Sequence, residues 1–187
     1  MNYFKFSIIL LFFFTSCKKD DSIKSAFECD APSHFTNTKE YKDVLSKFKL
    51  KVPKYWKTNL YFDEFQSEIY SADTTKQLSE TYIIDVTWHR GELRFDEEFE
   101  EKINKNITEK NDLITINSGY GKFKRRKSYY NISVGENTDI AYHYLQIFMK
   151  YSSDEYYTFT TKIYGEEFVN ERICTSIEVF ENIKFIK

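Results

Sequence analysis

The sequence has few of the residues that interrupt regular structure, and it lacks the common catalytic motifs. Only two prolines and five glycines occur among 187 residues, and this scarcity favours long strands over a loop-rich scaffold. No GxSxG, HExxH, CxxC or glycine-rich phosphate-binding motif is present. We therefore expect a protein that is not an enzyme, with no catalytic residues, no cofactor and no metal site.

The chain also lacks an excess of charge of either sign. The 27 Lys and Arg residues nearly balance the 29 Asp and Glu residues, and the formal net charge is −2. A protein dedicated to nucleic acid carries a strongly basic surface, because it must neutralise phosphates. The balance therefore argues against a nucleic-acid partner.

No apolar run is long enough to span a membrane. The apolar stretch at the N-terminus covers only Phe6–Phe14, whereas a membrane-spanning helix needs about 20 residues. Lys5 supplies a positive charge before this stretch, and small residues follow it. The pattern is typical of an export signal rather than a membrane anchor.

The end of this signal resembles that of a bacterial lipoprotein. Thr15 and Ser16 stand directly before Cys17, although Phe14 occupies the place where Leu is commonest in such signals. The resemblance implies removal of the signal peptide and attachment of fatty acids, such as palmitate, to Cys17. It implies that the protein meets the membrane through this N-terminal lipid.

A second short motif predicts where the lipoprotein is delivered. Lys19-Asp20-Asp21 resembles the signal that sends lipoproteins of Bacteroidota-type cells to the cell surface. We therefore expect an exported protein that is anchored to the outer membrane by its lipid and faces the outside of the cell.

The residues after the signal predict a tether and one domain. Residues 18–35 are mostly polar and contain one of the two prolines, which favours a flexible tether that lifts the domain off the membrane. Residues 36–187 are sufficient for a single domain.

With Cys17 assigned to the lipid, two cysteines remain, Cys29 and Cys174. Disulfides persist in an exported protein, so this pair is a candidate disulfide that would pin the tether to the C-terminal helix. The alternative is that both are free thiols buried among apolar side chains.

Hydrophobic periodicity predicts an α+β domain, a mostly antiparallel sheet flanked by helices. The clearest strand covers residues 81–88, and Asp96 is the predicted N-cap of a helix whose apolar residues recur every four positions. A C-terminal helix is expected after Gly165, and a short helix over 36–46. Further strands are expected over 48–52, 62–72, 113–118, 123–134, 140–151 and 156–164, with a turn at 119–121.

Several segments together resemble the PsbP/DcrB-like superfamily of small exported α/β/α domains. They are FKLKVPKYWK (Phe48–Lys57), TYIIDVTWHRGE (Thr81–Glu92), the hairpin over Tyr142–Gly165 and the final helix ending EVFENIKF. The resemblance covers about residues 41–187. It implies a non-catalytic role as an assembly factor, chaperone-like partner or accessory subunit of a membrane complex.

Two groups of residues are candidates for a partner surface. The aromatic candidates either form a platform for a sugar or peptide or fill the interfaces between sheet and helices. The basic candidates, within residues 122–127, either bind an acidic partner or lipid headgroup or protect a sheet edge. The aromatic group is Trp56, Trp88, Tyr129, Tyr130, Tyr156 and Tyr157, and the basic group is centred on Lys124, Arg125 and Arg126.

The strand over residues 81–88 carries three further candidates. His89 and Arg90 follow Trp88 and either face a ligand or end the strand in solvent. Asp85 either acts as an acid or base with a raised pKa or pairs with a cation on a neighbouring strand. A metal pair of His89 with His143 would need Asp85 as a third ligand.

These observations favour a non-catalytic envelope lipoprotein that binds an envelope protein. The alternatives are an immunity or inhibitor lipoprotein that neutralises a toxin, and a hydrolase that acts on glycan or peptide. Tight binding to one enzyme would distinguish the first alternative, and turnover that depends on Asp85 or His89 would distinguish the second.

Overall fold

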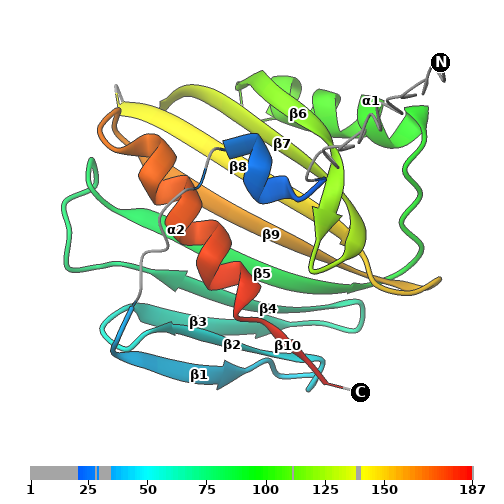
Figure 1. Cartoon of the computed structure of the whole chain (residues 1–187), viewed down its shortest axis with the longest axis horizontal. Helices are drawn as coiled ribbons and strands as arrows, with labels where there is room; N and C mark the ends of the chain where they lie inside the picture. Colours follow the sequence, from blue (N-terminus) through cyan, green and yellow to red (C-terminus); the bar gives the residue numbers. More distant parts are fainter. Residues whose placement is uncertain (1–20, 28, 30–34, 111, 138–139, 187) are drawn as a thin grey trace, which may run out of the picture.

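A computed structural model describes residues 21–27, 29, 35–110, 112–137 and 140–186 (Figure 1). The predicted signal peptide, with Cys17, lies outside the described residues, and so does His34. Among the helices described, none combines the length and the apolar character needed to cross a membrane.

A seven-stranded antiparallel sheet forms the centre of the molecule, in the order β3-β4-β5-β9-β8-β7-β6. Its first face packs against the main apolar core, and its second face is only partly covered. The strands are β3 (Lys57–Phe62), β4 (Gln66–Ala72), β5 (Tyr82–Arg90), β6 (Ile114–Phe123), β7 (Arg126–Asn137), β8 (Ile140–Lys150) and β9 (Glu155–Tyr164).

Helix α2 (Val169–Glu181) and a small sheet cover the first face of the large sheet. Figure 1 shows α2 crossing in front of the long strands, with the small sheet below it. The small sheet pairs β2 (Phe48–Pro53) with β1 (Thr38–Lys42) on one side and with β10 (Lys184–Phe185) on the other. The alternating residues of β2 are fully buried beneath α2, as a half-buried strand requires.

Helix α1 (Glu97–Lys105) continues into a π-turn, η2 (Asn106–Lys110), and packs on the second face. The Asp96 carboxylate accepts a hydrogen bond from the backbone N–H of Phe99 at 3.0 Å, which confirms the predicted cap. The Phe99 ring meets Tyr129 of β7 and Phe148 of β8 edge-on. The predicted four-residue stripe therefore does place α1 on the sheet, over β7 and β8.

The predicted α+β class with a mostly antiparallel sheet is confirmed. The strand predicted over 81–88 is β5, and its alternation is as expected, because Ile84, Val86 and Trp88 are fully buried on the first face. The C-terminal helix is also confirmed, with Ile177 and Phe180 buried against the sheet.

Three predictions about local structure were wrong. The helix expected over residues 36–46 is instead β1 and a turn. The Asp43 carboxylate accepts the backbone N–H groups of Lys47 and Phe48, both at 2.7 Å, and this closes a hairpin rather than a helix.

The second error was a single strand over residues 62–72, where the structure has the β3–β4 hairpin. Its turn is held by the Asp63 carboxylate, which accepts from the backbone N–H groups of Phe65 and Gln66. The third was a turn at residues 119–121. Strand β6 runs through these residues, and the turn to β7 lies at Lys124–Arg125.

The prediction of a flexible tether is wrong for residues 21–27, which the structure describes. Ser22 forms a β-bridge with Lys122, and residues 23–27 form a 3-10 helix, η1 (Ile23–Phe27), within the core. Only 1% of Ile23 and 6% of Phe27 is exposed, because both side chains cover the part of the first face that α2 leaves open. The described part of this segment is thus a structural element of the domain.

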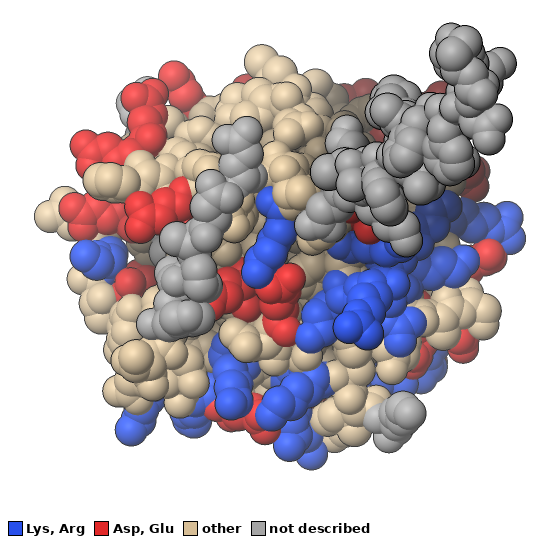
Figure 2. Space-filling model, in the orientation of Figure 1, with Lys and Arg blue, Asp and Glu red and all other residues tan. Residues whose placement is uncertain are grey.

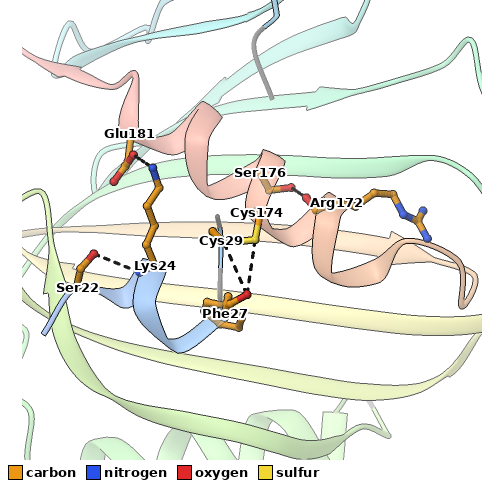
Figure 3. The surroundings of a disulfide bond; sticks show 8 residues. All are labelled: Ser22, Lys24, Phe27, Cys29, Arg172, Cys174, Ser176 and Glu181. Carbon is orange, nitrogen blue, oxygen red and sulfur yellow. Dashed lines mark hydrogen bonds and ion pairs between the residues drawn. A yellow bond between two sulfur atoms is a disulfide. The ribbon is translucent and has the colours of Figure 1, made fainter. Parts of the chain in front are cut away.

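A disulfide fixes η1 to the C-terminal helix (Figure 3). Cys29 and Cys174 are bonded, with 5.4 Å between their Cα atoms. Beside this bond, Lys24 of η1 forms an ion pair of 2.5 Å with Glu181 at the end of α2. The structure therefore contains the disulfide that we considered, and the alternative of two free thiols does not apply to it.

Candidate binding face of the large sheet

The second face of the large sheet carries a row of polar side chains, some buried and some half-buried. Strand register aligns Tyr70, Asp85, Thr160, Gln146 and Asn131 in one row across β4, β5, β9, β8 and β7. Around this row lie further tyrosines, and we call the whole set the tyrosine face. Its half-buried tyrosines are Tyr70, Tyr142, Tyr144, Tyr156 and Tyr164.

The tyrosine face exists because α1 covers only part of the second face. The helix contacts Tyr129 and Phe148 through Phe99, and it lies over β7 and β8. Among the described residues, no helix packs on the same side of β4 and β5. An antiparallel sheet tolerates one wet face, provided that its side chains on that face are polar or amphipathic.

A pair of carboxyl groups lies in the middle of the tyrosine face. Asp85 on β5 and Glu68 on β4 are diagonal neighbours on the same face of adjacent strands. Burial, and then the charge of Glu68, raise the pKa of Asp85 to about 7, and burial also raises the pKa of Glu68. The Thr87 hydroxyl donates a hydrogen bond of 2.7 Å to Asp85, which lowers the pKa of Asp85 and so opposes the effects of burial and of Glu68.

The charged and aromatic neighbours of this pair come from β8 and β9. The charge of Lys162 on β9 lowers the pKa of both carboxyl groups, which opposes the effect of burial. Its ammonium lies 6.0 Å from the ring centre of Tyr144. Burial raises the pKa of Tyr144 to about 12, so its hydroxyl stays neutral and can donate a hydrogen bond.

A cavity of about 300 Å³ adjoins the tyrosine face where the chain enters α1. Phe148 and Tyr156 form its floor, and side chains of α1 and of the segment before it form its wall. Charged side chains of both signs rim it, among them Glu92 and Arg94, which pair at 2.8 Å. The site therefore combines a broad aromatic surface with a small polar recess, and it suits contact with another molecule rather than enclosure of a small one.

Most of the predicted aromatic candidates are core residues. Trp88 is fully buried and only 3% of Trp56 is exposed, and the exposed fraction of Tyr129, Tyr130 and Tyr157 is below 9%. Only Tyr156 lies on the tyrosine face. The proposed platform of these six residues was therefore wrong, and the alternative reading, that such rings fill interfaces, is correct for five of them.

The two histidines that the structure describes, His89 and His143, do not form a site together. His89 lies on the second face, stacked on Tyr156 with 4.6 Å between ring centres, and it hydrogen-bonds to Thr158 at 2.9 Å. Burial lowers its pKa to about 4, which keeps the ring neutral. His143 pairs in register with Ile163, whose side chain is in the core of the first face, so the two histidines cannot share a metal ion.

Arg90 ends β5 as an exposed residue, 5.9 Å from the ring centre of the buried Trp88. This placement fits a solvated strand end. Among the described residues, no group of three or more His, Cys, Asp or Glu side chains is placed to hold a metal ion.

The basic candidates lie at the tip of the β6–β7 hairpin, away from the tyrosine face. The Lys124 ammonium donates to the carbonyl oxygen of Glu181 at 2.8 Å, and the Arg126 guanidinium donates to that of Tyr151 at 2.7 Å. Arg125 has no ion pair or hydrogen bond among the residues described. Arg126 is thus a packing residue, whereas Lys124 and Arg125 remain exposed.

The sequence did not reveal Glu68 as the neighbour of Asp85, because the β3–β4 hairpin was not predicted and no register placed the two together. A usable signal for the tyrosine face did exist. Tyr142 and Tyr144 alternate onto one side of β8, and Tyr156 and Tyr164 share a side of β9. Pairing of these two strands brings the four rings onto one face.

Comparison with known proteins gives similarity of structure only. No family model matches the chain, and no curated protein matches it in sequence. The cyanobacterial PsbP protein (CyanoP) of Synechocystis sp. PCC 6803 is similar in structure, with a TM-score of 0.60 and 11% identity over 83% of this chain and 96% of that one. The Ran-binding protein Mog1p of Saccharomyces cerevisiae has a TM-score of 0.52 and 9% identity over 81% of this chain and 96% of that one. The chain therefore has a PsbP-like α+β fold.

Proposed function

We propose that this protein is a non-catalytic lipoprotein of the cell envelope that binds a protein partner through its tyrosine face. The observation that carries the proposal is the set of half-buried tyrosines on a sheet face that α1 covers only in part. Tyrosine offers a large apolar ring and a hydroxyl donor, and it is enriched where proteins contact one another.

The carboxyl pair supports binding rather than catalysis. Retaining glycosidases hold two carboxyl groups about 5–5.5 Å apart, and inverting enzymes hold them further apart. Asp85 and Glu68 are diagonal neighbours on adjacent strands, and neither described histidine joins them as a proton carrier, because His89 is bonded to Thr158 with its pKa lowered by burial and His143 pairs in register with Ile163 of the first face. The pair fits a partner that presents a hydrogen-bond donor or a single positive charge.

The proposed location of the protein in the cell envelope rests on the sequence. The export signal and Cys17 favour attachment to the outer membrane by an N-terminal lipid, and Lys19-Asp20-Asp21 favours the cell surface. Of the similar structures, Mog1p is described as a Ran-binding protein. A PsbP-like domain is thus compatible with a role in binding a protein, and we extend that role to an accessory or assembly factor.

A pull-down with two matched variants tests the proposal. The tagged, lipidated protein is used to capture partners from detergent-solubilised envelopes, and mass spectrometry identifies them. We expect one stoichiometric partner, with a dissociation constant raised at least about tenfold by the double substitution Tyr70→Ala and Tyr164→Ala.

The control is Tyr41→Ala with Tyr55→Ala, because Tyr41 is half-buried on β1 of the small sheet and Tyr55, 52% exposed, lies in the turn after β2, both away from the tyrosine face. The control variant should bind the partner as the parent does. Equal loss of binding in both variants, or retention in both, would contradict a role for the tyrosine face.

A further inference from the structure

The N-terminal segment is fixed to the domain at Asp21. This point is much closer in sequence to Cys17 than the predicted tether over residues 18–35 implies. The backbone N–H of Lys122 donates to the carbonyl oxygen of Asp21 at 2.7 Å, and the side chains of the two residues form an ion pair of 2.5 Å. Beyond this point, buried Ile23 and the disulfide of Cys29 hold the chain in place. The domain therefore includes Asp21, the first residue that the structure describes.

This attachment limits how far the domain can stand from a lipid on Cys17. Three residues separate Cys17 from Asp21, and the four residue steps of a fully extended chain between them span at most about 14 Å. Asp21 lies against Lys122, two residues before the β6–β7 turn. An acyl chain on Cys17 thus brings the tip of this hairpin to the membrane surface.

The hairpin tip is basic, and most of its charge is not neutralised. Lys124 and Arg126 donate to carbonyl oxygens, so both keep their positive charge, and Lys127 lies 5.4 Å from the ring centre of Phe95. Among the residues described, only Lys122 has a carboxylate partner in this group. Figure 2 shows the resulting concentration of basic side chains near the middle of the visible face.

The turn places two basic residues in a backbone conformation that they seldom adopt. Lys124 has a φ of 50° and Arg125 a φ of 64°. Two-residue hairpin turns of this type favour Asn-Gly, because most other residues are strained there. Strained residues that persist at an exposed tip point to a role for their side chains.

The opposite end of α2 has the opposite charge. Exposed acidic side chains surround a cavity of about 790 Å³ beside the start of α2, and they include Glu80, Glu166, Glu167 and Glu171. The basic tip contacts Glu181 at the end of the same helix. A 13-residue helix is about 20 Å long, and an anionic surface would therefore attract one end of the molecule and repel the other.

We propose that Lys124, Arg125 and Lys127 dock the domain on the phosphate headgroups of an anionic phospholipid bilayer, beside its own lipid anchor. This inference rests on the proposed acylation of Cys17. It gives the domain a fixed orientation, with the basic hairpin on the membrane and the acidic cavity directed away from it. Each basic residue near such a surface strengthens binding severalfold.

The test measures how lysines react when the purified, acylated protein is bound to vesicles. One set of vesicles contains phosphatidylcholine alone, and the other also contains about 30% phosphatidylglycerol. A water-soluble amine reagent labels the protein, and mass spectrometry measures labelling at each lysine. We expect Lys124 and Lys127 to react at least about threefold more slowly on the anionic vesicles, and about 0.5 M salt to abolish the difference by screening.

Charge-reversal variants provide the matched control. Arg125→Glu with Lys127→Glu should remove the dependence of Lys124 labelling on anionic lipid. Lys54→Glu with Lys76→Glu makes the same change in charge at the end that carries the acidic cavity, and should leave that dependence intact.

The outcomes separate docking from acylation. If the protein carries the acyl chain and floats with both vesicle types, but Lys124 reacts equally on both, docking is overturned and the anchor stands. If the protein lacks the acyl chain and does not float, the anchor is overturned and the docking that depends on it falls too.

Discussion

The carboxyl group of Asp85 departs strongly from its ordinary chemistry. Burial and Glu68 raise its pKa from 3.8 to about 7. The folded state therefore binds this proton more tightly than the unfolded state, and the resulting stability is complete below about pH 4 and is lost as the pH rises through 7.

We expect Asp85→Asn to stabilise the protein at pH 8 and to have little effect near pH 4. A neutral amide keeps a hydrogen-bond donor toward Glu68 without a second negative charge, and the free energy of unfolding at pH 8 should rise by roughly 2–4 kcal/mol. Urea unfolding at several pH values measures the change. Asp112→Asn, at an exposed position, is the control and should follow the parent, whereas a pH-independent effect of Asp85→Asn would contradict the raised pKa of Asp85.

Single residues also show what the sequence could not reveal about the site. Trp88 and Tyr156 are both aromatic residues near strand ends, yet one is buried beneath Lys47 and the other lies on the tyrosine face. Composition identifies an aromatic surplus, but the side on which a ring lies depends on the strand register. That register was clear in β5 and β9, whereas nothing local predicted which face of the sheet α1 would leave open.

The elements that the sequence predicted best are those whose pattern repeats within one segment. β5 and α1 each carry a complete alternation or stripe, so their own residues decide their structure. β1 is different, because its residues are mostly exposed and it is a strand only by pairing with β2. η1 was missed for a related reason, since Ile23 and Phe27 are two apolar residues in a polar segment, and their burial depends on a surface built by distant strands.

The disulfide is the element-level feature with the clearest measurable consequence. Cys29 and Cys174 are 145 residues apart in sequence, and closing so long a loop restricts the unfolded chain by an amount worth roughly 2–5 kcal/mol. Cys29→Ser with Cys174→Ser should lower the free energy of unfolding by this amount and speed amide exchange in η1. Urea unfolding with and without a reductant checks it, because the reductant should weaken the parent and leave the variant unchanged.

At the scale of the whole molecule, one residue of the N-terminal segment belongs both to the proposed surface-delivery signal and to the folded domain. Asp21 belongs to the proposed surface-delivery signal, and it is also the residue that pairs with Lys122. A substitution at Asp21 thus changes both the signal and an ion pair. The two effects differ greatly in size, because an exposed ion pair contributes only about 0–1 kcal/mol.

We expect the substitution of Lys19, Asp20 and Asp21 by Ala to leave the protein lipidated and folded but to remove it from the cell surface. Protease applied to intact cells should degrade the parent and spare this variant, while both float with outer membranes. Lys122→Ala is the matched control, because it breaks the same ion pair and leaves the signal intact, and it should remain accessible to protease. If the parent resists the protease on intact cells, or if Lys122→Ala is protected as well as the triple variant, the three residues do not act as a surface signal, and the basic hairpin would then face the inner leaflet of the outer membrane.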